Sequence, residues 1–126
     1  LAGGLREHAA RVFALEAPDK TGISQRQRLD GLLDRARTAE RRSEIQAELD
    51  VPPAPVGVGY LLEIFDQLAA RRPNTSCGPA LLPWSEIDAW QRVTGRRLTA
   101  WEASMIVMLD EIQVAEIYRA MKDENG

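Results

Sequence analysis

Hydrophobic residues recur three or four positions apart over most of this chain, which is the spacing of one face of a helix. In the first such segment, residues 5–15, Leu5, Ala9, Val12 and Phe13 fall on one face. Proline and glycine follow within seven residues and interrupt the pattern. The pattern therefore predicts a helix over residues 5–15 that ends in a turn.

A second helical pattern begins after Ser24, a residue type that favours the N-cap position. Oppositely charged pairs three residues apart, such as Arg41 and Glu44, stabilise an exposed helix by roughly 0.2–0.5 kcal/mol each. We expect one solvated helix that continues from Ser24 to residue 49, with an apolar edge that narrows along its length. The residues of that edge are Leu29, Leu32, Leu33 and Ala36, followed by Ala39, Ile45 and Leu49.

The clearest boundary in the chain is the segment 51–59, which holds three prolines within four residues and then two glycines. Proline removes backbone donors and favours an extended course, so helical structure is not expected here. We interpret residues 51–59 as a Pro/Gly hinge. It divides an N-terminal helical arm, residues 1–50, from a C-terminal helical bundle, residues 60–126.

Helical spacing resumes at residues 60–72 and again at 84–94, with a turn-rich loop between them. Gly95 follows the shorter helix at the position that favours a left-handed cap. Thr99 and Glu102 then fit a capping box, which opens a helix expected to run to about Met121. We find no alternating strand pattern of useful length. The prediction is an all-α fold of about five helices, three of them in the C-terminal bundle.

Composition adds limits on the class of protein. The chain has 126 residues, 44% of them hydrophobic, which is enough for one domain or a domain with an arm. Its 16 basic and 19 acidic side chains are mixed along the sequence and give a net charge of −3. No apolar run approaches the ~20 residues needed to cross a bilayer, and no signal peptide is visible. We expect a soluble intracellular protein.

Few residues are candidates for catalysis or metal binding. Cys77 is the only cysteine and His8 the only histidine, which excludes an internal disulfide and the usual cysteine or histidine zinc sites. No nucleophile stands near His8 in sequence, and no glycine pair has the lysine and spacing of a phosphate loop. We therefore predict no enzyme activity, no cofactor and no metal site.

Two other patterns suggest binding surfaces. Arg28, Arg35 and Arg42 recur every seven residues and would share one face of the second helix, as a phosphate-contacting stripe would. Acidic residues interleave this stripe, and the balanced charge speaks against nucleic-acid binding. Trp84 and Trp101 lie near helix starts, where they either staple a corner or contact a partner.

The C-terminal half resembles a known family. The motif runs from residues 60–65, Tyr-Leu-Leu-Glu-Ile-Phe, through 83–90, Pro-Trp-Ser-Glu-Ile-Asp-Ala-Trp, to 98–102, Leu-Thr-Ala-Trp-Glu, and then Leu109-Asp110. This succession is similar to that of the tail assembly chaperones of siphophages and prophages. It departs from the pattern after Asp110, where an aromatic residue is expected shortly but Tyr118 comes late.

The resemblance implies a non-enzymatic protein of the bacterial host cytoplasm that binds the tape-measure protein, or another tail protein, and shields it during tail morphogenesis. Homo-oligomerisation is compatible with this role. Alternatives are a structural or self-assembling virion component, or a regulator that binds nucleic acid through the arginine stripe. For partner contact we single out four apolar residues of the bundle, namely Leu61, Phe65, Trp84 and Trp101.

Overall fold

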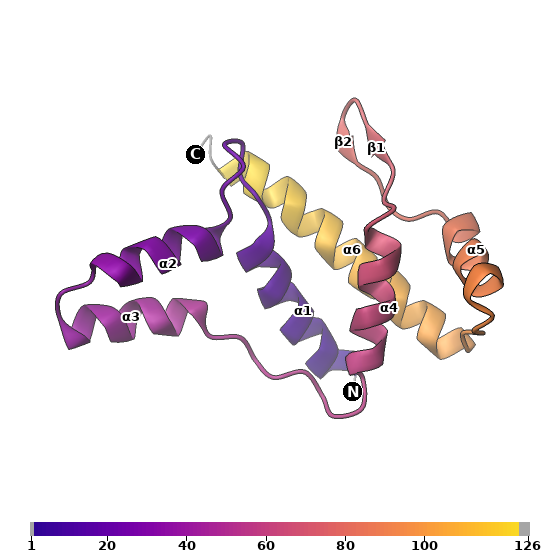
Figure 1. The fold of residues 1–126 in the computed structure, drawn as a ribbon, viewed down its shortest axis with the longest axis horizontal. Helices are drawn as coiled ribbons and strands as arrows, with labels where there is room; N and C mark the ends of the chain where they lie inside the picture. Colours follow the sequence, from indigo (N-terminus) through magenta and orange to yellow (C-terminus); the bar gives the residue numbers. More distant parts are fainter. Residues whose placement is uncertain (1, 124–126) are drawn as a thin grey trace.

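A computed structural model describes residues 2–123 and confirms the all-α prediction. The described chain forms six helices and one short β-hairpin, in an elongated arrangement (Figure 1). None of the helices in this range is long and apolar enough to cross a membrane. The elements are α1 (Ala2–Glu16), α2 (Gln25–Arg35), α3 (Ala39–Leu49), α4 (Gly59–Ala69), β1 (Asn74–Thr75), β2 (Gly78–Pro79), α5 (Trp84–Thr94) and α6 (Ala100–Asp123).

The main core lies where α1 and α4 pack against α6 (Figure 1). The apolar faces expected at residues 5–15 and 60–72 both point into it, together with one face of α6. Helix α1 therefore shares its core with the C-terminal helices. The division into an N-terminal arm and a C-terminal bundle at residues 51–59 stays a prediction. The buried residues of this core are Leu5, Ala9, Phe13, Val58, Leu61, Ile64, Phe65, Leu68, Leu82, Ile87, Met105, Ile106, Met108 and Leu109.

The expected single helix from Ser24 to residue 49 is wrong, because the chain folds back between α2 and α3. Ala36 has an extended backbone, and the Thr38 side chain caps α3 by accepting a 3.1 Å hydrogen bond from the Arg41 amide. Folding back brings Leu29 and Ile45 together around Leu15 at the end of α1, in a second, smaller core. A continuous helix would have carried Ile45 into solvent.

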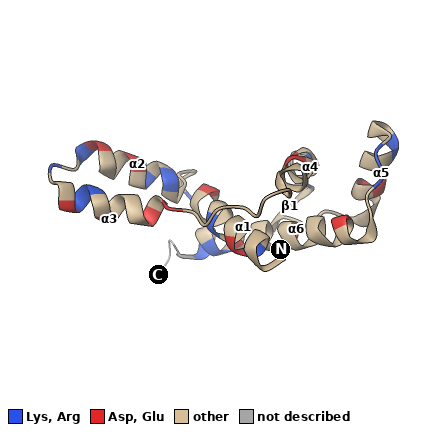
Figure 2. Ribbon diagram, turned by 90° about the horizontal axis from the view of Figure 1, so that it is seen from below, with Lys and Arg blue, Asp and Glu red and all other residues tan. Residues whose placement is uncertain are grey.

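This pair of helices, called the α-hairpin from here on, projects from one end of the molecule, whereas α5 lies at the other end (Figures 1 and 2). Polar contacts join it to α1. The Arg11 guanidinium donates to the carbonyl oxygens of Glu48 and Asp50 at the end of α3. A ring nitrogen of His8 lies 2.8 Å from the carbonyl oxygen of Pro52 in the linker that follows.

A buried ion pair fixes the loop between α4 and α5. The Arg72 guanidinium lies 2.5 Å from Asp110 of α6, and both side chains are less than a tenth exposed. Asp110 also accepts a 2.8 Å hydrogen bond from the Leu82 amide, while Arg72 donates to the Ala80 carbonyl and to the Gln113 side chain. These bonds supply the partners that buried charges require.

The short β-hairpin packs on Tyr118, whose hydroxyl donates a 2.7 Å hydrogen bond to the carbonyl oxygen of Pro79. Gly78 has a φ of 119°, and a Cβ atom there would lie 2.9 Å from the Tyr118 hydroxyl oxygen. Only glycine fits this position, both for its backbone and for space. Tyr118 therefore anchors the loop of the β-hairpin on α6.

Three predicted helix-end signals are confirmed, namely the N-cap Ser24, the capping box at Thr99 and the cap at Gly95. Ser24 and Gln27 form a reciprocal capping box at α2. Thr99 and Glu102 form another at α6, with bonds of 2.8 and 3.1 Å. Gly95 ends α5 with a φ of 73°, in the left-handed region.

Candidate partner-binding surfaces

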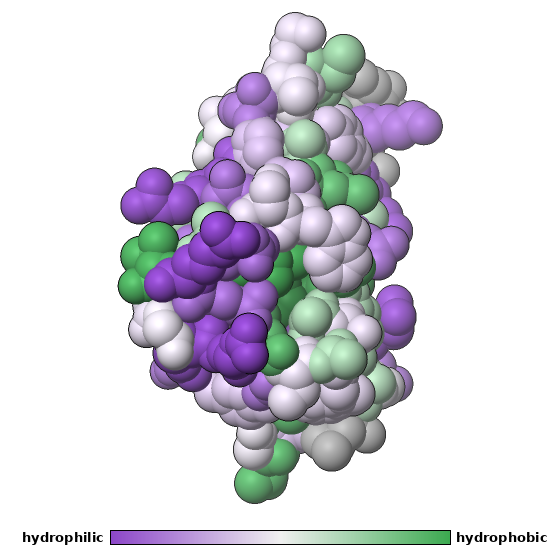
Figure 3. All heavy atoms as spheres, turned by 90° about the vertical axis from the view of Figure 1, so that its right-hand side faces the viewer, coloured by the Kyte–Doolittle hydropathy of each residue, from purple (hydrophilic) through white to green (hydrophobic). Residues whose placement is uncertain are grey.

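Large apolar side chains are exposed at the end of the molecule that carries α5. Trp84 is 67% exposed, Val93 84% and Trp101 43%, and Leu81 lies in the loop just before α5. We call these four residues the α5 end. On this face, hydrophobic side chains lie beside a cluster of strongly hydrophilic ones (Figure 3). Exposed tryptophans of this kind are typical of contact residues in protein interfaces.

The four residues singled out from the sequence divide into two groups. Trp84 and Trp101 are exposed at the α5 end. Leu61 and Phe65 are fully buried on α4, and the Phe65 ring centroid lies 5.6 Å from that of Phe13. Their burial makes them residues of the core, unavailable to a partner in this structure.

Trp90 occupies a structural position, three residues after the buried Ile87 of α5. It packs against the main core, and its indole nitrogen donates a 2.9 Å hydrogen bond to the Gln67 side chain of α4. The Arg96 guanidinium stacks over its ring at 5.4 Å from the ring centroid. Trp90 thus helps to fix α5 on α4 and leaves Trp84 free on the outside.

The Glu102 carboxylate at the start of α6 lies close to the Tyr60 hydroxyl at the start of α4. The amide of Thr99 and the Tyr60 hydroxyl donate to the Glu102 carboxylate and lower its pKa. The hydrogen bond between Tyr60 and Glu102 also raises the pKa of Tyr60. Further along α4, partial burial and the neighbouring Glu63 raise the pKa of Asp66. Helix α4 thus carries two neighbouring acidic residues, Glu63 and Asp66, whereas Arg92, Arg96 and Arg97 lie around the end of α5.

A second surface, which sequence reasoning missed, is a groove of about 520 Å³ between α2 and the C-terminal part of α6. Its apolar lining includes Ile23 and Leu32, both exposed, and the buried Leu29. One feature of the sequence could have predicted this groove. The stripe on α2 contains more leucines than the small core around Leu15 buries, so Leu32 is left on the outside.

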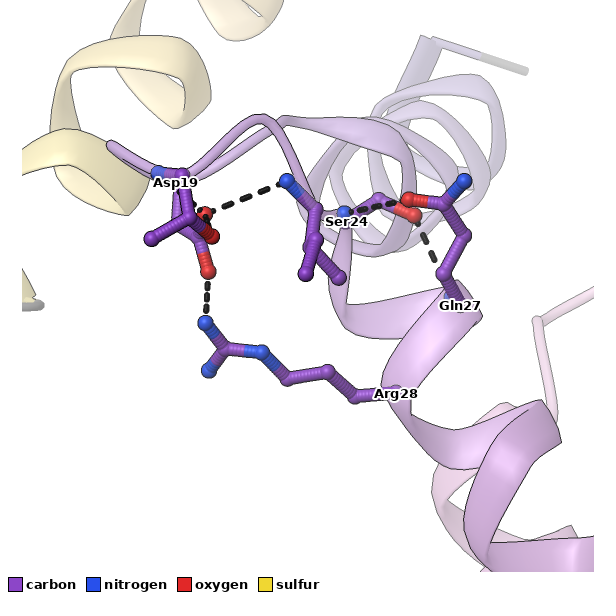
Figure 4. A network of polar contacts seen from close by, with 6 residues as sticks. Asp19, Ser24, Gln27 and Arg28 are labelled. Carbon is purple, nitrogen blue, oxygen red and sulfur yellow. Dashed lines mark hydrogen bonds and ion pairs between the residues drawn. The ribbon is translucent and has the colours of Figure 1, made fainter.

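The turn before α2 forms one edge of this groove and is organised around Asp19. One carboxylate oxygen of Asp19 accepts bonds from the amides of Thr21 and Ile23, at 2.8 and 3.2 Å, and from the Thr21 hydroxyl. The other oxygen forms an ion pair with Arg28 of α2 (Figure 4). Asp19 therefore fixes both the turn and the first part of α2.

Arg28, Arg35 and Arg42 do not form the stripe that a single helix would have given them, because α2 ends at Arg35 and the chain turns before Arg42. Arg28 and Arg35 belong to α2, Arg42 belongs to α3, and Arg28 is paired with Asp19. Acidic and basic residues are mixed along both helices (Figure 2). This arrangement gives no continuous basic surface for a nucleic-acid backbone.

The candidates for chemistry stay apart from one another. His8 contacts the linker carbonyl of Pro52, and Cys77 is an exposed thiol in the loop of the β-hairpin. Within residues 2–123, no three His, Cys, Asp or Glu side chains come together as metal ligands would.

Comparison with known proteins gives one family. The model of a family described as phage tail assembly chaperone matches residues 38–114, which is more than half of the chain and extends from the cap of α3 into α6. No curated protein and no solved structure matches the chain. The matched range contains the α5 end and the buried Arg72–Asp110 pair. The sequence resemblance is thereby confirmed, and the chain belongs to the phage tail assembly chaperone family.

Proposed function

We propose that this protein binds an apolar helical segment of the tail tape-measure protein and shields it from aggregation until the tail tube assembles. We further propose that it does so in the host cytoplasm and without catalysing a reaction. Membership of the family supports a role in tail assembly. The tape-measure protein as the partner is the expectation that the sequence resemblance raised.

The observation that carries this proposal is the exposure of large apolar side chains outside a complete core. Trp84 and Val93 are exposed large hydrophobic residues of α5, although Ile87 and Trp90 already pack that helix against the main core. Such side chains lose contact with water when a partner covers them, which stabilises the complex by about 25 cal/mol for each Å² of apolar surface buried. We propose Trp84 and Trp101 as contact residues.

The test is co-expression of the chain with overlapping segments of the tape-measure protein, followed by affinity purification and native mass spectrometry. We expect at least one segment to co-purify in a complex of defined stoichiometry. The double variant Trp84→Ala/Trp101→Ala should weaken that complex, whereas Val56→Ala, a change at a fully exposed linker residue, should not. Failure of all segments to bind the intact chain would overturn the proposal.

The alternative of a structural virion component makes an opposite prediction for finished particles. A chaperone is displaced during assembly, so purified tails should lack the chain. A stoichiometric band of this protein in purified tails would contradict the chaperone role and favour the structural one.

A further inference from the structure

The groove between α2 and α6 has walls from three helices. Ala14 and Ala17 come from the end of α1 and the turn after it, Leu29 and Leu32 from α2, and Ala120 from α6. The alanines are small, so they leave room for side chains of a partner between the helices. Ile23 and Leu32 remain exposed there and would be covered by an occupant.

In the groove, the acidic side chains are buried and the basic side chains are exposed. The carboxylates of Asp19 and Glu116 are only 9% and 10% exposed, whereas their partners Arg28 and Arg119 are 54% and 62% exposed. Arg28 belongs to α2 and Arg119 to α6, so a guanidinium group lies on each of the two main walls. The groove therefore presents positive charge at its surface on both sides of an apolar lining.

A guanidinium group has five N–H donors, and each of these two arginines uses only part of them on its buried carboxylate. The remaining N–H donors on the exposed side of each guanidinium group can bind a carboxylate of a partner. Arginine suits this role because its planar group binds carboxylates with two parallel hydrogen bonds.

We propose that this groove binds an amphipathic helix whose apolar stripe is flanked on both sides by acidic side chains. The apolar stripe would cover Ile23 and Leu32, and the flanking carboxylates would meet Arg28 and Arg119. A helix is the expected occupant because helices form the walls, and an apolar helix face fits between them as helix-in-groove recognition requires. The inference rests on the proposed function in that the tape-measure segment would supply such a helix.

The charge requirement is tested with three fluorescent 18-residue helical peptides that share one leucine stripe and differ only in flanking residues, which are Glu, Gln or Lys. Fluorescence anisotropy should show the Glu peptide binding about three to ten times more tightly than the Gln peptide, with the Lys peptide weakest. Raising the salt concentration should reduce the difference. Equal affinities, or tightest binding of the Lys peptide, would overturn the inference.

The location is tested with variants of the full chain. Leu32→Glu, and independently Ile23→Glu, should reduce binding of the Glu peptide by at least about tenfold, because each places a carboxylate on the apolar lining. Val93→Glu at the α5 end is the matched control, and it should bind as the unchanged chain does. Circular dichroism confirms the fold of each variant. If both groove variants fold and bind normally, the groove is not the site.

A third variant separates charge from packing. Glu116→Gln/Arg119→Ala removes the exposed guanidinium without leaving a buried carboxylate unpaired. It should weaken the Glu peptide about threefold or more and leave the Gln peptide unchanged. An equal effect on both peptides would contradict the role given to Arg119.

The outcomes separate this inference from the proposed function. If a tape-measure segment binds the unchanged chain and the Leu32→Glu variant alike, but is lost on Trp84→Ala/Trp101→Ala, the function stands and the groove inference fails. If the Glu peptide binds the groove while no tail segment binds the chain, the groove inference stands and the proposed function fails.

Discussion

The body of the molecule and the α-hairpin are both helical, yet different interactions stabilise the two regions. The body, formed by α1, α4, α5 and α6, shares one continuous apolar core and a buried ion pair. The α-hairpin fully buries only Leu29 and Ile45, which pack with Leu15 of α1 in the smaller core. Exposed polar contacts such as Arg26–Glu16 also attach it to α1. Extensive burial determines the stability of the body, whereas the α-hairpin depends on a smaller set of contacts with α1.

This difference bears on the groove, because one wall comes from each region. Helix α6 belongs to the body and α2 to the α-hairpin. Regions with few buried apolar contacts open at lower free energy than a main core does. We expect the wall formed by α2 to adjust to a bound helix while the wall formed by α6 stays fixed.

The largest effect is expected for Phe65→Ala in the body. Phe65 is fully buried against Phe13, so its truncation removes apolar contacts and leaves a cavity. The free energy of unfolding should fall by about 3–5 kcal/mol, measured by urea denaturation. A loss of less than about 1 kcal/mol would show that α4 does not pack in the core as described.

A loss of about 3 kcal/mol is expected for Asp110→Asn, because it leaves the Arg72 guanidinium buried without its counter-charge. The double variant Arg72→Met/Asp110→Leu replaces the pair by apolar groups and should regain part of that stability. If the single variant is as stable as the unchanged chain, the pair is not buried in solution.

Ile45→Ala should cost about 2–3 kcal/mol, but within the α-hairpin alone. Ile45 is almost completely buried between α2, α3 and Leu15. Hydrogen exchange should become faster throughout α2 and α3 while the amides of α4 and α6 keep their protection. Equal acceleration in both regions would contradict the division into a body and a separately held α-hairpin.

The smallest effect is expected at Glu102, whose lowered pKa links stability to pH. Because the folded state holds the carboxylate below its ordinary pKa of 4.5, its contribution is present above that value and is lost as the pH falls through the folded pKa. Glu102→Gln keeps the cap and loses this dependence. The melting temperatures of the two proteins should differ by about 2 °C or less at pH 7 and converge at pH 3.

Much of the fold followed from local signals. The N-cap at Ser24, the capping box at Thr99 and the left-handed Gly95 depend on residues close together in sequence, and all three were predicted. The break in the helix after Ala36 was not predicted. It depends on the burial of Ile45 against Leu15, which is a contact between segments far apart in the sequence.

The surfaces were predicted in part for the same reason. The sequence left Trp84 and Trp101 open between stapling a corner and contacting a partner, and the structure exposes both. The burial of Leu61 and Phe65 depends on α1 packing into the core, and the groove depends on α2 facing α6. Hydrophobic spacing shows that a face is apolar, but it does not show which partner covers that face.

The most direct test of the chaperone role is a sedimentation assay. A tape-measure segment is diluted from denaturant into buffer with increasing amounts of this protein, and the soluble fraction is measured after centrifugation. We expect the soluble fraction to rise and to saturate at a fixed molar ratio, with less protection by Trp84→Ala/Trp101→Ala. A segment that sediments to the same extent at every ratio would contradict the account.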